Sequence, residues 1–373
     1  MPGFAVLRRG RWLVSIGLAL LAACTTPPSP AGPVGEIVAE GVIVCPPPTE
    51  RCELSGATVT GGQLLLVNDR AHAGQLGDSV LVVPLDALAG RIEARYLPGL
   101  PKMPAEKLEA ITTTSDGRHV FAITSFDRHD AANSAQDRFN MLLTWPAQRP
   151  QAARVLGAEP GRGGASLQLR RQLRAALATA AEPQGPGYFK VEGLAALPDQ
   201  LLIGVREIGA SYHKPQFTLI ILAVPWTQSP AGPVLAGPAK VVWRLEPAAL
   251  GPLPMVPVGL SDLAYDAAAD RLWLLTSVER DDSVDGVAGY IWRLDRAALA
   301  RGAPPVPLRG RDGKPLLFRH KPEALAILPD GRLLVVHDDD RRATLVRDPA
   351  SGTRRPRLQN EGIWQAVGPG DSH

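Results

Sequence analysis

Two stretches of the chain, EGLAALPDQLLIGVR (192–206) and EALAILPDGRLLVVH (323–337), repeat one pattern and decide the fold. Each begins with an acid, continues through an apolar segment to a Pro-Asp turn, and ends in an apolar strand with a polar tip. Such turn residues favour a tight reversal, so each copy predicts a β-hairpin. Related copies begin at 109 (EAITTTSDGRHVFAITS), at 262 (DLAYDAAADRLWLLTS) and, without the acid, at 55 (SGATVTGGQLLLVND). The chain therefore contains five similar hairpins.

Two more strand-like stretches follow each hairpin. Four strands repeated five times are typical of a β-propeller, so we expect an all-β domain over residues 35–373. A parallel α/β fold would need helices between strands, and the connections are too short or too rich in Pro and Gly. A β-sandwich would not require the same unit five times. The stretches cover 79–85 and 91–97, 139–145 and 152–156, 217–224 and 240–245, 289–294 and 305–308, and 343–348 and 355–359.

Three segments lie outside this repeat. Residues 167–181 (LQLRRQLRAALATAA) place apolar side chains on one helical face, which predicts a helix inserted between the second and third blades. Residues 35–44 and 362–367 are strand-like. Pairing of these two end segments would close the ring, and a partial sixth blade is the alternative.

The N-terminal residues have the pattern of an export signal. Arg8, Arg9 and Arg11 precede an apolar run over 12–23, shorter than the roughly 20 residues that span a membrane. The run ends in Leu-Ala-Ala-Cys at 21–24, which resembles the lipobox of bacterial lipoproteins. That resemblance implies a signal peptide over 1–23, a lipid on Cys24, a Pro-rich tether over 24–34, and an outer-membrane position facing the periplasm. The alternatives are an ordinary signal peptide or a short anchor.

Charge and cysteine content limit the classes of partner and ligand that we expect. The chain has 40 basic and 37 acidic residues, and three of the basic ones lie in the predicted signal, which leaves a balanced mature chain. This balance gives no indication of nucleic-acid binding. Cys45 and Cys52 predict a local disulfide in an oxidising compartment. No second Cys/His pair supports a metal site at this pair.

Propeller geometry predicts where the polar residues converge. The first strand of each blade lines the central channel and begins at one mouth, and the second strand returns to that mouth. The repeated acids should therefore meet there, together with the polar ends of the second strands. The acids are Glu109, Glu192, Asp262 and Glu323, and the strand ends supply Asp69, Arg206, Glu207, His337, Asp338 and Asp339.

Converging carboxylates require compensation by a hard cation, raised pKa values, or basic partners. One hypothesis is a Ca²⁺ or Mg²⁺ site formed by the four acids. The other is structural, with the acids accepting backbone N–H groups from the next blade or pairing with Lys107, Lys190 and Lys321, each two residues before an acid. His337, beside three Asp, is the candidate general base or metal ligand. Arg206 would bind an anionic group or pair with Glu192 or Glu207.

The segments KVEGLAALPDQLLIGVRE (190–207) and KPEALAILPDGRLLVVHDDD (321–340) resemble the bacterial propeller family called "esterase-like activity of phytase". The resemblance extends over about residues 55–340 and implies ester or phosphoester hydrolysis. The gluconolactonase family is similar in placing ligands around a divalent cation at the channel mouth, which would make Glu109, Glu192, Asp262 and Glu323 the ligands. The sequence departs from that pattern at Ser55, which stands where the first blade would carry its acid.

Three functions remain open on the sequence. The leading hypothesis is a membrane-anchored periplasmic propeller that binds a small ligand or an envelope protein at the acidic mouth. The second is a metal-dependent phosphoesterase or lactonase acting there. The third is a structural component of the envelope. The chain contains no Gly-x-Ser-x-Gly or His-Glu-x-x-His motif to decide between them.

Overall fold

The computed structural model describes residues 1, 32–70, 74–128, 133–159, 164–348 and 351–369. The fold described below belongs to the unit that begins at residue 32. Cys24 and the predicted signal peptide lie outside the described residues. None of the helices in the described ranges combines the length and the apolar character needed to cross a membrane.

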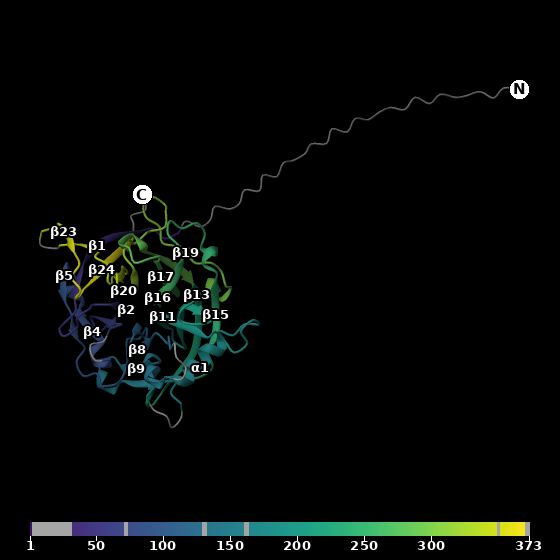
Figure 1. Cartoon of the computed structure of the whole chain (residues 1–373), viewed down its shortest axis with the longest axis horizontal. Helices are drawn as coiled ribbons and strands as arrows, with labels where there is room; N and C mark the ends of the chain where they lie inside the picture. The colour runs from purple at the N-terminus through teal and green to yellow at the C-terminus, as the bar shows by residue number, and fades with distance from the viewer. Residues whose placement is uncertain (2–31, 71–73, 129–132, 160–163, 349–350, 370–373) are drawn as a thin grey trace. The chain divides into compact units, whose positions relative to one another are not determined.

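Five antiparallel sheets surround a common axis and form the predicted propeller (Figure 1). The inner strands of neighbouring blades contact one another around the whole ring, in the order β2, β7, β11, β16, β20 and back to β2. Blade 1 consists of β2 (Leu54–Thr60), β3 (Gln63–Asn68), β4 (Val80–Pro84) and β6 (Arg95–Tyr96), and blade 2 of β7 (Leu108–Thr113), β8 (His119–Thr124), β9 (Leu142–Pro146) and β10 (Arg154–Leu156).

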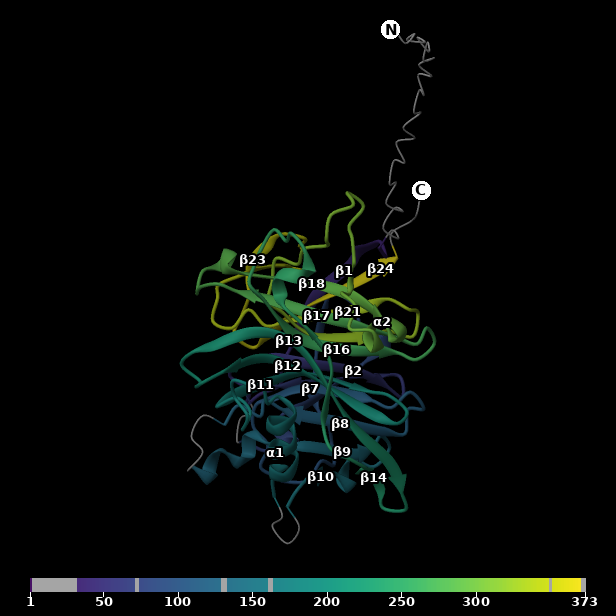
Figure 2. The same ribbon diagram turned by 90° about the vertical axis from the view of Figure 1, so that its right-hand side faces the viewer.

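The third blade carries an extension. Its strand β13 runs beyond the blade into a hairpin with β14, which reaches β9 of blade 2 (Figure 2). Blade 3 consists of β11 (Tyr188–Ala196), β12 (Gln200–Gly209), β13 (Pro215–Ser229) and β15 (Lys240–Leu245), with β14 (Gly232–Leu235) as the extension, and blade 4 of β16 (Val258–Asp266), β17 (Arg271–Glu279), β18 (Val287–Asp295) and β19 (Val306–Pro307).

The two ends of the chain close the ring within blade 5. This blade consists of β20 (Pro322–Ile327), β21 (Leu333–His337), β24 (Glu361–Pro369) and β1 (Gly35–Val44). Strand β24 pairs with β21 on one side and with β1 on the other, so the first and last strands complete the same sheet. Ring closure by the chain ends is confirmed, and the described part of the chain contains no sixth blade.

The sequence assigned the wrong segments to the outer half of blade 5. The stretches 343–348 and 355–359 were expected there, but β22 (Leu345–Arg347) and β23 (Arg354–Pro356) form a separate hairpin. Strand β24 takes the place beside β21 because it is long and almost completely buried, whereas β22 and β23 are short and largely exposed. The stretch 91–97 also divides, since β5 (Arg91–Glu93) joins β1 in parallel and only β6 joins blade 1.

The inserted helix is present but shorter than predicted. Helix α1 covers Leu167–Ala176, and beyond it Thr179 and Glu182 exchange backbone hydrogen bonds in a turn before Pro183. A proline disfavours helical backbone at the residue before it, which is consistent with a helix that ends before Pro183. The other helical segments are short: α2 (Arg296–Ala300) and the 3-10 turns at Leu76–Asp78, Leu85–Ala87, Ser134–Phe139, Pro150–Ala152, Pro247–Leu250 and Val284–Gly286.

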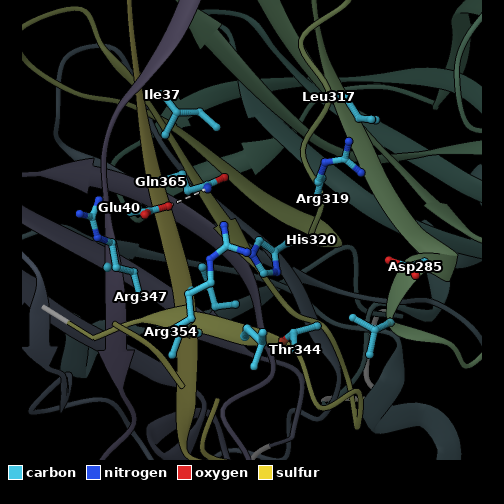
Figure 3. A pocket seen from close by; sticks show the side chains of 15 residues that line it. Ile37, Glu40, Asp285, Leu317, Arg319, His320, Thr344, Arg347, Arg354 and Gln365 are labelled. Atoms are coloured by element: carbon cyan, nitrogen blue, oxygen red, sulfur yellow. Dashed lines mark hydrogen bonds between the residues drawn. The ribbon is translucent and has the colours of Figure 1, made fainter. Parts of the chain in front are cut away.

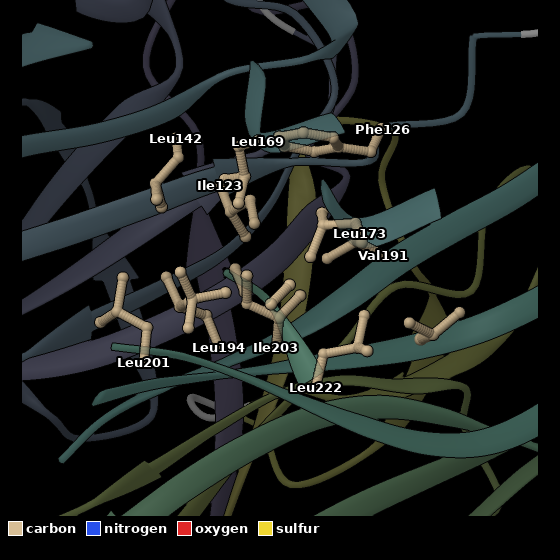
Figure 4. Packing of buried hydrophobic residues seen from close by; sticks show 14 of the residues in the cluster. Ile123, Phe126, Leu142, Leu169, Leu173, Val191, Leu194, Leu201, Ile203 and Leu222 are labelled. Atoms are coloured by element: carbon tan, nitrogen blue, oxygen red, sulfur yellow. The ribbon is translucent and has the colours of Figure 1, made fainter. Parts of the chain in front are cut away.

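Helix α1 packs onto the core between blades 2 and 3 (Figure 4). Its Leu169 and Leu173 are fully buried in one cluster with Phe126 and Val191. Each such side chain contributes about 1.5–3 kcal/mol by leaving water. The helix is therefore part of the fold at this corner of the ring.

Two close contacts join blade 1 to its neighbours. Cys45, after β1, and Cys52, before β2, form the predicted disulfide, with a Cα–Cα distance of 5.5 Å. On the other side, a Cβ at Gly56 would lie 2.7 Å from the Cα of Ala110 in blade 2. Glycine is required at that position because the two inner strands approach this closely.

Candidate functional site

Every blade has an irregularity at the same position of its first strand. The register between first and second strand shifts there by one residue in all five hairpins, and blade 3 has a second shift between Lys190 and Val191, which leaves Arg206 of β12 without a partner in the register. Such a bulge re-aims the side chain of the extra residue. The equivalent residues are Ser55, Glu109, Glu192, Ser261 and Glu323.

This register corrects one position of the predicted acidic ring. Asp262 stands one residue after the bulge of blade 4, so Ser261 is the residue equivalent to the three glutamates. Asp262 instead accepts the backbone N–H of Leu325 in blade 5 at 2.8 Å and that of Leu263 at 2.8 Å. It thereby ties blade 4 to blade 5, as the structural hypothesis for the repeated acids expects.

The three glutamates meet basic side chains at one mouth of the channel. The group comprises Glu109, Lys190, Glu192, Arg206, Lys321 and Glu323, and is called the mouth cluster below. Lys190 forms an ion pair with Glu192 and lies 3.3 Å from Oε1 of Glu109 in the preceding blade. Lys321 lies 3.2 Å from Oε1 of Glu323. The predicted pairing of Lys190 and Lys321 with the acids two residues on is confirmed.

Arg206 connects blade 3 to blade 4 from inside the cluster. Its side chain is 2% exposed. Its Nη1 donates to the hydroxyls of Ser261 at 2.8 Å and Ser277 at 2.6 Å, and lies 3.4 Å from Oε2 of Glu192. Its guanidinium carbon lies 4.8 Å from the ring centroid of Phe217. Arg206 also approaches Glu207, with 3.8 Å between Nε and Oε1, so both expected acidic partners are present.

Burial and neighbouring charges shift the pKa values of the three glutamates in different directions. It raises the pKa of Glu323 to about 8, although the charge of Lys321 acts in the opposite direction. Burial likewise raises the pKa of Glu109 well above its usual range. Burial acts on Glu192 too, but Arg206 and Lys190 outweigh it and lower the pKa of that carboxyl. The mouth cluster therefore contains one carboxyl whose pKa is lowered beside two carboxyls whose pKa values are raised.

Several polar atoms of this region make no hydrogen bond. Oε1 of Glu109, Oε1 of Glu323, Oδ1 of Asp69 and Nη2 of Arg206 are buried and without a hydrogen-bond partner among the described residues, although Lys190 and Lys321 form ion pairs with the first two. Buried polar groups are nearly always hydrogen-bonded in proteins, so exceptions indicate a bound water or ligand. Asp69 directly follows β3 at this mouth. The backbone N–H of Lys107 donates to the backbone carbonyl of Asp69 at 3.2 Å.

The strand ends around the cluster are held by local contacts. One hypothesis from the sequence paired Lys107 with Glu109, but Lys107 forms its ion pair with Asp127 of its own blade. Its backbone has a φ of 61°, a left-handed conformation that non-glycine residues adopt at specific sites. Glu207 accepts the hydroxyl of Tyr188 at 3.2 Å, and Asp338 accepts the N–H of Asp340 at 2.8 Å.

The carboxylates are not arranged around a common cation position. Lys190 lies between Glu109 and Glu192, where an ion bridging them would have to be. Within the described residues, no three Asp, Glu, His or Cys side chains are grouped to hold a metal. These residues do not fit Ca²⁺ or Mg²⁺ as they stand, and the predicted metal site stays a prediction.

His337 lies in the core, and the neighbouring His320 is partly exposed. His337 is 1% exposed, and both ring nitrogens make no hydrogen bond to any described residue. Burial and the nearby His320 lower its pKa to about 3. Its ring packs 5.5 Å from Phe318 and 5.4 Å from His320, centroid to centroid. Its surroundings are those of a packed core residue, and a catalytic role for it stays a prediction.

His320 was missed by the sequence analysis. Its Nδ1 lies 2.6 Å from Oδ2 of Asp339, a buried carboxylate whose other oxygen accepts the N–H of Lys321 at 2.8 Å. Burial alone would raise the pKa of Asp339, but the hydrogen bond from His320 lowers it to about 2. The residue has no counterpart in the other blades, so the repeat gave no signal for it.

Comparison with known proteins identifies no family for this chain. No protein-family description matches the sequence, and no curated protein matches it. Among solved structures, similarity is found to a GH43 β-1,3-galactosidase (10% identity, 85% of this chain and 90% of that one, TM-score 0.44). It is also found to Myxococcus xanthus glutaminyl cyclase (12%, 92% and 100%, TM-score 0.41) and to a Xanthomonas campestris gluconolactonase (11%, 84% and 71%, TM-score 0.38). No ligand or catalytic residue is transferred from similarities this low.

Proposed function

We propose that the protein binds a small, neutral, hydroxyl-rich molecule at the mouth cluster. The observation that carries the proposal is the set of buried polar atoms without hydrogen-bond partners among the described residues, contributed by Glu109, Glu323 and Arg206. These atoms are held by ion pairs but make no hydrogen bond, and a ligand that supplies both donors and acceptors would complete their hydrogen bonding.

Charge and burial define the class of ligand. The cluster contains three acidic and three basic side chains that pair with one another, so an ion of either sign would have to displace an existing ion pair. The side chains of Glu109, Glu192 and Glu323 are at most 6% exposed, which is too recessed for contact with a protein surface. A compact polyol or sugar-like molecule suits this combination better than an envelope protein.

Calorimetric titration with glucose, myo-inositol and δ-gluconolactone tests the proposal. We expect saturable binding of at least one of them, weakened about tenfold or more by Glu109→Gln, because a buried carboxylate acceptor becomes an amide. Glu93→Gln is the matched control, since Glu93 is a 68%-exposed strand glutamate of β5. Equal affinity in both variants, or no binding of any probe, would contradict the proposal.

Hydrolysis of a lactone or phosphate ester at the same cluster is the second candidate. It is favoured by the divergence of two neighbouring carboxyls, because the pKa of Glu323 is raised to about 8 while that of Glu192 is lowered. A protonated and an ionised carboxyl side by side are a usual acid–base arrangement. Loss of δ-gluconolactone or p-nitrophenyl phosphate, with and without chelator, measures this activity, and Glu323→Gln should abolish it.

Anchoring in the cell envelope is part of the proposal. The basic, apolar and Cys24 pattern at the N-terminus supports a lipid-modified Cys24 and a periplasmic domain. Incorporation of labelled fatty acid into the full chain, lost in Cys24→Ser and retained in Thr25→Ser, is the expected result. Equal labelling of both variants would exclude the anchor.

A further inference from the structure

A pocket separate from the mouth cluster lies beside blade 5. It has a volume of about 440 Å³ and is bounded by the β22–β23 hairpin, by β1 and β24, and by the segment that leads into β20. Figure 3 shows the side chains that line it. The hairpin is the segment that the sequence wrongly placed in the blade, so the repeat gives no account of this pocket.

Basic side chains outnumber acidic ones in its lining. Arg319, Arg347 and Arg354 line the pocket, are exposed, and form no ion pair within the described part of the chain. Two acids also line it, Glu40 and Asp285. Glu40 already accepts a hydrogen bond from Nε2 of Gln365 at 3.4 Å. Three arginines against two acids leave a small positive excess.

His320 is held in a fixed orientation at the pocket wall. The hydrogen bond between its Nδ1 and Asp339 leaves Nε2 as the nitrogen available to a ligand. The side chain of Asp339 is fully buried, whereas that of His320 is 18% exposed. A buried carboxylate that binds Nδ1 in this way fixes the orientation of the ring and directs Nε2 toward a ligand.

Two buried polar atoms at the pocket lack partners. Oγ1 of Thr344 and Oε1 of Gln365 line the pocket region and make no hydrogen bond with any described residue. Thr344 is 1% exposed and Gln365 is 7% exposed. The hydroxyl of Thr344 can donate to an oxyanion, and water or a ligand hydroxyl can donate to Gln365. These atoms are an independent sign that the pocket holds a polar group.

We infer that this pocket binds a small organic oxyanion, a carboxylate or a phosphate monoester, through Arg319, Arg347, Arg354 and His320. Arginine presents paired N–H donors that match the oxygens of either group. Val284 and Leu345, which are 43% and 50% exposed, line the same pocket and would contact the carbon part of the ligand. The two acids limit the positive charge, which disfavours nucleic acids and other polyanions. The inference does not depend on the function proposed for the mouth cluster.

Calorimetric titration of the full chain with phenyl phosphate, benzoate and benzyl alcohol tests the inference. The first two probes carry the two headgroups on one ring, and the third lacks the charge. We expect saturable binding of phenyl phosphate or benzoate, and the tighter of the two identifies the headgroup. Binding of benzyl alcohol with equal affinity, or no saturable binding of the anions, would overturn the inference.

Variants locate the binding. Arg354→Gln should weaken the anion about tenfold or more through loss of charge-assisted hydrogen bonds. Arg244→Gln is the matched control, because Arg244 is an exposed strand arginine of blade 3 that does not line this pocket. Glu109→Gln in the mouth cluster should leave the anion affinity unchanged. Equal affinities of the Arg354 and Arg244 variants would place any binding elsewhere and refute the assignment.

Discussion

The mouth cluster and the blade 5 pocket both contain arginines, but only in the mouth cluster is the arginine charge compensated by neighbouring side chains. In the mouth cluster, Arg206 is 2% exposed and its neighbours Glu192, Ser261 and Ser277 engage it. In the pocket, Arg354 is exposed and forms no ion pair with a described residue. At the repeated hairpins, the acidic and basic side chains compensate one another and join the blades. The hairpin outside the repeat carries arginines without ion-pair partners among the described residues, which are available to a ligand.

Replacing Arg206 should give the largest loss of stability. Arg206→Met removes the cation that Glu192, Ser261 and Ser277 share, and breaking a buried ion pair costs about 3–5 kcal/mol. The free energy of unfolding in urea measures the effect. Arg354→Gln, from the pocket, is the control and should change stability by no more than about 0.5 kcal/mol. Similar losses in both variants would break the contrast between the two regions.

Removing the carboxylate of Asp262 should have the next largest effect. Asp262→Ala leaves the backbone N–H of Leu325 in blade 5 without its acceptor, at a cost of about 1–3 kcal/mol. The same urea titration measures it, with the exposed Asp282→Ala as control. A loss no larger than that of Asp282→Ala would show that Asp262 does not hold the two blades together.

The dependence of stability on pH should change in Glu323→Gln. The pKa of Glu323 is raised from 4.5 to about 8 in the folded state, so the folded chain keeps a proton there that the unfolded chain loses. Stability from this group therefore falls as the pH rises from about 4.5 to about 8. The glutamine variant lacks this term, so its stability relative to the wild type should increase across that range. A difference independent of pH would refute the raised pKa.

Metal removal should have the smallest effect. Lys190 and Arg206 compensate the acids of the mouth cluster, so dialysis against a chelator should leave the melting temperature unchanged. Thermal unfolding with and without added Ca²⁺ measures this. A rise with Ca²⁺ that Glu192→Gln abolishes would restore the metal site predicted from the sequence and remove the contrast in charge compensation.

The repeat made most of the fold predictable. Glu192 and Glu323 stand at the same place in two copies of one pattern, and period-2 apolar strands with Asp/Gly turns specify hairpins locally. The same logic placed Glu109 at the shared mouth and anticipated the ion pairs of Lys190 and Lys321. The Cys45–Cys52 disulfide was predictable too, because the two residues are close in sequence.

Only the tertiary structure decided the finer placement. Each first strand contains a one-residue bulge that the sequence pattern does not reveal. Because of this bulge, Ser261 and not Asp262 occupies the position equivalent to the glutamates. Competition between β24 and the β22–β23 segment for the edge of β21 also depends on strands far apart in the chain.

The amino-acid pattern alone was therefore sufficient for the five hairpins, for the shared mouth and for three of its four predicted acids, because these follow from local periodicity repeated along the chain. Tertiary structure decided which base compensates which acid, that His337 is buried while His320 is accessible, and that Arg319, Arg347 and Arg354 share a pocket. The physical reason is that charge pairing and burial depend on distances between segments remote in sequence, which a local pattern does not encode.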